Sequence, residues 1–74
     1  MLIIHNDGMG ITNMDTVCEL VVSGRYIHAY CVNGSHHPVA VYGSIERAME
    51  VFKDIIGRVE SYDDYTKTIT LPEE

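Results

Sequence analysis

The sequence has few basic side chains, only two cysteines and two prolines, and no long apolar run. Runs such as Leu2–Ile4 and Leu20–Val22 are far shorter than the roughly 20 apolar residues that span a bilayer, so no transmembrane helix is expected. The opening Met-Leu-Ile-Ile-His has neither a positively charged region nor a small-residue cleavage site, so no secretory signal is expected. The sequence therefore predicts a cytoplasmic protein that does not bind membranes.

Acidic residues outnumber basic ones. Eleven Asp and Glu against five Lys and Arg give a net charge of −6. Five of these acids, with a single lysine, lie within residues 60–74, which therefore hold most of the excess charge. Proteins that bind nucleic acid carry basic patches that release counterions from phosphates. The charge therefore argues against direct nucleic-acid binding.

Two cysteines do not form a disulfide framework, and both are expected to be small buried apolar residues. A metal site would have to be built from the residues Cys18, Cys31, His5, His28, His36 and His37. No C-x-x-C or H-x-x-x-H spacing is present, and adjacent residues of a strand point to opposite faces. No metal or cofactor is expected.

Catalytic chemistry has one candidate pair. Cys31 and His36 would lie side by side across a predicted hairpin, as a thiol nucleophile and its base. No third orienting group or oxyanion site accompanies them, and a chain of 74 residues has little room to enclose a substrate. The sequence therefore predicts a protein that is not an enzyme, with no catalytic residue.

The expected fold class is α+β, an antiparallel β-meander of four to five short strands packed on one C-terminal amphipathic helix. β-branched or alternating segments bounded by Gly, Asn and Asp predict the strands. They are Leu2–His5, Ile11–Asn13, Thr16–Val22, Tyr26–Val32 and His36–Tyr42. Residues 1–59 form the expected domain, and residues 60–74 an acidic, Tyr-containing segment. Its alternating part, Tyr65–Leu71, predicts a short extra strand in the protein's own sheet or at a partner's edge.

The dipeptide Asn33-Gly34 predicts a two-residue hairpin with a type I′ turn. This register places Cys31 opposite His36, Tyr30 opposite His37 and His28 opposite Val39. One face then holds Tyr26, His28, Tyr30, His37, Val39 and Val41. The other holds Ile27, Ala29, Cys31, His36 and Ala40, and we expect this smaller, more apolar face to be covered by the helix.

The helix is expected to begin after Ser44, whose hydroxyl can cap its first free amides. Apolar residues then recur with a period of 3.6 at Ile45, Ala48, Met49, Phe52, Ile55, Ile56 and Val59. The helix ends near Gly57 or about one turn further on. Because a chain this short buries only about 60% of the surface of its unfolded state, self-association to a homodimer is also expected.

Two surfaces are candidate partner sites. Tyr26, His28, Tyr30 and His37 share the face that the helix leaves open, and such amphipathic rings are enriched at interfaces. The alternative is cross-strand aromatic packing without a partner. The segment Tyr62, Asp63, Asp64 and Tyr65 combines carboxylates with aromatic rings, which can occupy a basic, nucleic-acid-binding surface on another protein. The alternative there is a solvated linker.

The short strand with its turn, Ile3–Gly8, and the segment Tyr42–Ile56, which opens with Tyr-Gly-Ser-Ile-Glu-Arg-Ala, carry a resemblance. The sequence resembles small uncharacterised proteins common in Firmicutes and their phages. The resemblance implies a phage or prophage context, in which small acidic domains often act as inhibitors of host defence. It supplies no catalytic residue.

The leading hypothesis is a small, homodimeric, phage-type protein that inhibits a host defence protein by occluding one of its surfaces. A second hypothesis is an oligomeric sponge that sequesters a nucleotide signal, with Arg25, Arg47 or Arg58 on the phosphate, because the guanidinium fork suits phosphate. A third is a virion or assembly component.

Overall fold

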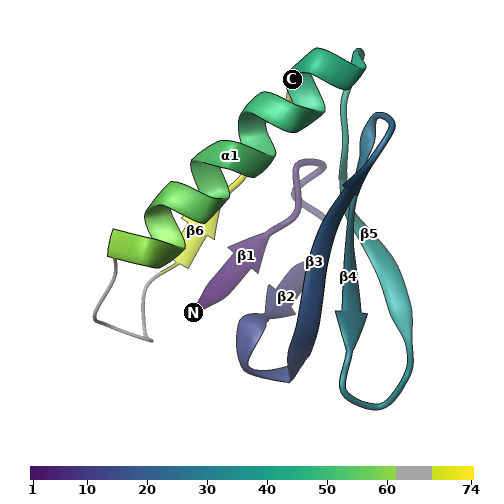
Figure 1. Ribbon diagram of the computed structural model, residues 1–74, viewed down its shortest axis with the longest axis vertical. Coiled ribbons are helices and arrows are strands. Elements are labelled where there is room, and N and C mark those ends of the chain that lie inside the picture. Colours follow the sequence, from purple (N-terminus) through teal and green to yellow (C-terminus); the bar gives the residue numbers. More distant parts are fainter. Residues whose placement is uncertain (62–67) are drawn as a thin grey trace.

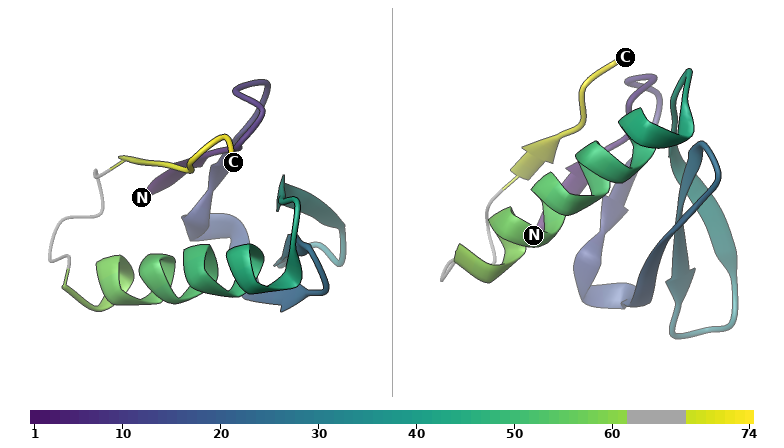
Figure 2. Two further views of the ribbon diagram at one scale, coloured as in Figure 1. Left: turned by 90° about the horizontal axis from the view of Figure 1, so that it is seen from above. Right: turned by 45° about the horizontal axis from the view of Figure 1, so that its top comes forward.

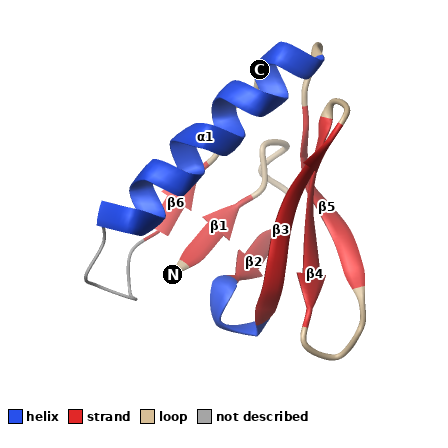
Figure 3. Ribbon diagram, viewed as in Figure 1, coloured by secondary structure: helices blue, strands red, loops and turns tan. Residues whose placement is uncertain are grey.

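The computed structural model describes residues 1–61 and 68–74. These residues form an α+β fold with more strands than expected, six in two sheets (Figures 1 and 3). In chain order the elements are β1 (Leu2–Ile4), β2 (Ile11–Asn13), the 3-10 helix η1 (Met14–Thr16), β3 (Val17–Ser23), β4 (Tyr26–Cys31), β5 (His36–Val41), α1 (Ile45–Ser61) and β6 (Thr68–Thr70).

The first sheet has the strand order β2-β1-β6 and the second the order β3-β4-β5. Strand β2 returns antiparallel to β1 through a turn in which Gly8 has a φ of 73°. Strand β6 lies parallel to β1, with Ile3 opposite Ile69. The expected meander is therefore confined to the second sheet, which is antiparallel throughout. Of the alternating segment Tyr65–Leu71, residues 68–70 pair with the protein's own β1, and residues 65–67 lie outside the described residues.

The two sheets and the helix enclose the core from three sides. In Figure 2, α1 forms one layer, β1 and β6 lie across from it, and the second sheet stands at the end where the helix begins. The buried residues come from all three parts and are Ile3, Ile27, Ala29, Val39, Ala40, Tyr42, Ala48, Val51, Ile55, Ile69 and Leu71. Within the described ranges, no helix has the length and hydropathy that crossing a membrane requires.

The helix begins as the sequence predicts. The hydroxyl of Ser44 accepts a hydrogen bond from the backbone N–H of Arg47 at 3.1 Å, which satisfies one of the free amides of the first turn. The helix continues to Ser61, so the domain boundary expected after residue 59 falls inside it. Ile69 and Leu71 are buried with the rest of the core, and the hydroxyl of Tyr42 donates to the carbonyl of Pro72 at 2.9 Å. Residues 68–72 therefore pack against the rest of the fold.

The helix buries a narrower part of its apolar stripe than the sequence suggests. Ala48 and Ile55 are buried, as expected, together with Val51, which lies outside the predicted stripe. Four members of that stripe are exposed, namely Ile45, Met49, Ile56 and Val59. The stripe is wider than the contact with the two sheets, and tertiary packing decides which side of it is covered.

The loop at Asn33-Gly34 is longer than the predicted two residues. The N–H of Gly34 donates to the carbonyl of Cys31 at 3.0 Å, and the N–H of Cys31 donates to the carbonyl of Ser35 at 2.8 Å. Of the loop residues only Gly34 has a positive φ, 89°, whereas a type I′ turn needs two, so the prediction of a type I′ turn is wrong. A three-residue loop closed by a glycine in the left-handed region is the next common hairpin type.

This loop shifts the pairing of β4 with β5 by one residue at the loop end. Tyr30 lies opposite His36, not His37, and His28 lies opposite Pro38, not Val39. A β-bulge then restores the predicted register, so that Ile27 lies opposite Ala40. The predicted core face is confirmed for Ile27, Ala29 and Ala40, while Val39 at the bulge is buried instead of facing outward. Pro38 lies on an edge strand, as its missing N–H requires.

A second irregularity lies in β3. Its register with β4 shifts between Val17 and Glu19, so that Cys18 has no partner residue across the strands. Cys18 is exposed and Cys31 only half-buried, so the expectation of two buried thiols is wrong. On either side of this shift, Val17 and Leu20 pack against the core.

Candidate functional site

The second sheet has an outer face on the side opposite the buried Ile27 and Ala29, and the turn after β1 borders it where Asn6 and Asp7 line a hollow with Tyr26 and Pro38. The register of β3, β4 and β5 brings nine residues together on this side, and we refer to them as the outer face. They are Glu19, Val21 and Ser23 from β3, Tyr26, His28 and Tyr30 from β4, and His36, Pro38 and Val41 from β5. It combines rings with apolar side chains and holds a single formal charge, that of Glu19.

Two ring stacks order the outer face. The rings of Tyr26 and His28 stack with their centroids 5.7 Å apart, and those of Tyr30 and His36 with theirs 5.1 Å apart. Tyr26 is 40% exposed and Tyr30 is 41% exposed, so the stacks fix the rings without hiding them. The buried Nδ1 of His28 has no hydrogen-bond partner among the described residues. The rings are therefore held in place at a surface open to a partner.

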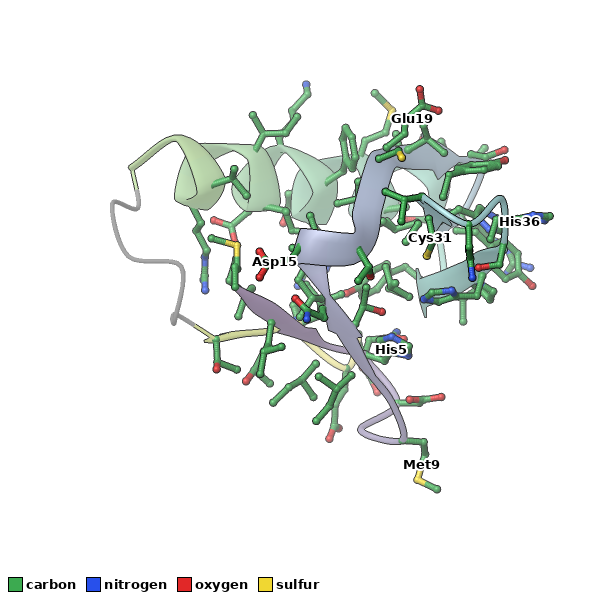
Figure 4. All side chains as sticks on the ribbon, turned by 90° about the horizontal axis from the view of Figure 1, so that it is seen from below. His5, Met9, Asp15, Glu19, Cys31 and His36 are labelled. Atoms are coloured by element: carbon green, nitrogen blue, oxygen red, sulfur yellow. The ribbon has the colours of Figure 1, made fainter. Side chains whose placement is uncertain are left out.

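His37 does not belong to this face, although the predicted register placed it there. It lies opposite Ala29, and its Nε2 lies 3.1 Å from the hydroxyl of Thr12 on β2. His36 takes its place beside Tyr30 and projects outward, well away from His5 (Figure 4). Because adjacent strand residues point to opposite faces, a slip of one residue exchanges the two histidines.

His5, Thr12 and His37 form a polar cluster between the two sheets. The Nε2 of His5 lies 2.6 Å from the hydroxyl of Thr12, which is 4% exposed, and the rings of His5 and His37 are 5.9 Å apart. The hydroxyl has one hydrogen and can donate to only one of the two imidazoles, so the other imidazole must donate to it. When both imidazoles are neutral, one therefore carries its hydrogen on Nε2 and the other on Nδ1.

The pKa of His5 is lowered from its ordinary value. Burial is the main cause, repulsion from His37 adds to it, and attraction by Asp7 opposes it. The folded state therefore favours neutral His5, whereas the unfolded chain protonates it at about pH 6.5. This difference in pKa between the folded and unfolded states leaves the free energy of unfolding unchanged above about pH 6.5. Below that pH the free energy of unfolding decreases, because protonation of His5 favours the unfolded chain.

We expect the free energy of unfolding to fall between pH 7.5 and pH 5.5, and His5→Gln to reduce this fall. Gln has no charge to gain, so the contribution of His5 disappears from the pH dependence. Urea denaturation of both proteins at the two pH values measures it. Met9→Gln, which introduces the same amide at an exposed position without removing a titratable group, serves as the control and should leave the dependence as it is. An equal fall in wild type and His5→Gln would contradict the assignment.

The structure does not assemble the metal or nucleophile candidates. Among residues 1–61 and 68–74, no three His, Cys, Asp or Glu side chains are grouped to hold a metal ion. Cys31 pairs with Val17, and His36 pairs with Tyr30, so the thiol and the imidazole are not opposite each other. The longer hairpin loop is again the reason.

Two of the three candidate phosphate-binding arginines reach one groove. Arg47 and Arg58 line a groove of about 380 Å³ between α1 and the chain around Thr70 and Pro72. Both already have partners, since Arg47 pairs with Glu50 and binds the main-chain oxygen of Glu74, and Arg58 lies 3.0 Å from Asp54. Arg25 lies in the turn between β3 and β4 and does not line this groove. A phosphate would have to displace these carboxylates.

The acidic candidate segment, Tyr62, Asp63, Asp64 and Tyr65, lies outside the described residues. A further surface is not among the candidates that the sequence indicates. Beside α1 lies an apolar groove of about 300 Å³, lined by Met14, Leu20, Phe52, Ile55, Ile56 and Val59. The exposed part of the stripe was the signal that could have indicated it.

Comparison of the chain with protein-family models, curated proteins and solved structures finds no match.

Proposed function

We propose that the protein acts without catalysis, by binding another protein through the outer face of its second sheet. The observation that carries the proposal is that Tyr26 and Tyr30 of β4, 40% and 41% exposed, are each held by stacking on a histidine ring. Tyrosine supplies much of the binding energy at protein interfaces, and a ring that is already fixed loses little conformational freedom on binding.

The partner that the charge favours is a basic protein. The chain carries a net charge of −6, whereas the outer face holds only Glu19, so attraction acts at long range and contact is made by rings and apolar groups. This separation between the charge of the whole chain and the nearly uncharged outer face speeds the encounter of the two proteins. It does so without placing many charges in the desolvated centre of the interface. A surface that binds nucleic acid fits this description.

In its narrower form, the proposal is that of a phage-type inhibitor in the host cytosol that covers such a surface on an anti-phage defence protein. The phage context rests on the resemblance carried by Ile3–Gly8 and Tyr42–Ile56. A homodimer would present two outer faces and would bind a symmetric host protein more tightly than a single copy. Sequestration of a nucleotide gains no comparable support, because Arg47 and Arg58 are engaged with carboxylates.

Affinity capture from a host lysate would identify candidate partners, and titration of the purified partner then tests the face. Tyr30→Ala should weaken binding by about 30-fold or more, as truncation of an interface hot spot does. Met9→Ala is the control, because Met9 is 86% exposed at the tip of the turn between β1 and β2 (Figure 4). The double variant Asp63→Lys with Asp64→Lys measures the contribution of the acidic segment to partner binding, because it leaves the outer face unchanged. A partner that binds Tyr30→Ala as tightly as wild type would refute the proposal.

A further inference from the structure

The exposed part of the helix stripe has a regular spacing of its own. Five residues of the stripe follow one another at steps of four, three, four and three, and we refer to them as the helix seam. They are Ile45, Met49, Phe52, Ile56 and Val59. This is the spacing of the two apolar positions of a heptad, by which one helix packs against another helix. The residues that α1 buries against its own sheets, Ala48, Val51 and Ile55, are a separate set.

Four of the five residues of the helix seam are exposed, and Phe52 at its centre is half-buried against the core. Ile45 is 53% exposed, and Met49, Ile56 and Val59 are each between 42% and 43% exposed. At 3.6 residues per turn, the centre of the seam lies about 90° around the helix from the buried side. The apolar groove beside α1 continues this surface toward Met14 and Leu20. So much exposed apolar surface on one side of a single helix marks an interaction site.

We propose that the helix seam binds the helix seam of a second copy of this chain, with the two helices antiparallel around a two-fold axis. The argument for a second copy is the charge along the solvent side of the seam. Glu46 follows Ile45 and Lys53 follows Phe52, so an acid flanks one part of the seam and a base another. Under a two-fold rotation, this pattern is complementary to itself.

The charges also select a register. With Met49 against Phe52 of the second copy, Ile45 packs against Ile56, and Glu46 comes beside Lys53 of the other helix at two symmetric places. Sliding the helices to bring Met49 against Val59 would instead bring the two Lys53 side chains together. Opposite charges beside an apolar seam set orientation and register in helix pairs, and like charges disfavour the alternative.

This interface is separate in space from the outer face, although the dimer would add to the affinity for a symmetric partner. The seam lies on α1, whereas the outer face lies on the far side of the second sheet from the buried Ile27 and Ala29. Loss of self-association therefore leaves the outer face intact, and loss of partner binding leaves the seam intact. The oligomeric state and the partner affinity can be measured separately on the same variants.

Sedimentation equilibrium of the purified protein over a range of concentrations tests the proposal. Wild type should be a dimer, and Met49→Glu should raise the dimer dissociation constant about tenfold or more, because it places two unpaired charges in an apolar interface. Ile11→Glu, a change of an isoleucine that is 64% exposed on β2, should leave the dimer unchanged. Circular dichroism checks that both variants keep the fold. A wild-type protein that stays monomeric at every concentration, or a dimer that Met49→Glu leaves intact, would overturn the proposal.

An exchange of charges tests the register without touching any apolar residue. Glu46→Lys alone and Lys53→Glu alone each create two like-charge pairs and should weaken the dimer by about 2- to 30-fold. The combined exchange, Glu46→Lys with Lys53→Glu, should restore it, since each pair is again of opposite sign. Equal dimer affinity in all four proteins, or a double exchange weaker than both single variants, would reject the antiparallel register.

Discussion

Ile69→Ala should lower the free energy of unfolding by about 2–5 kcal/mol, the range measured when a buried isoleucine or leucine is cut back to alanine. Ile69 is 1% exposed, and it packs in β6 beside the buried Ile3 of β1. In a domain of this size each kcal/mol moves the melting temperature by about 4–8 °C, so the transition should shift down by about 8 °C or more. Thermal and urea denaturation followed by circular dichroism measure both quantities.

Ile11→Ala is the matched control, because it removes the same atoms from another strand of the same sheet. Ile11 is 64% exposed on β2, and the loss there should be about 0.5 kcal/mol or less. If the two variants lost equal stability, β6 would not be part of the core. The comparison thus tests directly whether residues 68–71 are a structural strand or an appendage of the domain.

Gly10→Ala should destabilise the protein by about 1–3 kcal/mol, as overpacking of a close contact does. A Cβ at this position would lie 2.5 Å from Nδ1 and 2.8 Å from Cε1 of the His5 ring. The ring cannot move aside freely, since its Nε2 is held by the hydroxyl of Thr12 at 2.6 Å. The substitution must therefore displace the ring and break that hydrogen bond, which urea denaturation would register.

A double-mutant cycle with His5→Ala isolates this contact. Without the imidazole, Gly10→Ala meets no clash, so its cost should nearly vanish in the His5→Ala background. Gly43→Ala is the control at a glycine with open space around it and no positive φ. An effect of Gly10→Ala that persists in full without the ring would place its cause in the backbone.

Local chemistry explains the features that the sequence predicts correctly. The helix start depends on the hydroxyl of Ser44, and the turn after β1 depends on a glycine at position 8 with positive φ. Along β4, alternation alone places Tyr26, His28 and Tyr30 on one side, whatever strand lies next to it. Each of these outcomes is determined within a few residues of the chain.

The features that the sequence misses depend on contacts between distant segments. The dipeptide Asn33-Gly34 suits both a two-residue and a three-residue loop, and the choice between them decides whether His36 or His37 joins Tyr30. The apolar stripe of α1 does not tell which of its sides meets the sheets. Nor does any local signal indicate that β6 pairs with β1.

The parallel pairing of β1 with β6 also determines the order in which the structure can form. The two strands come from opposite ends of the described chain, so joining them closes a loop of nearly its whole length. The hairpins that link β3, β4 and β5 close over only a few residues and can form much earlier. We infer that the second sheet forms first and that β6 docks late. Changes in β6 would then act mainly by speeding unfolding, so this strand governs how long the native state persists.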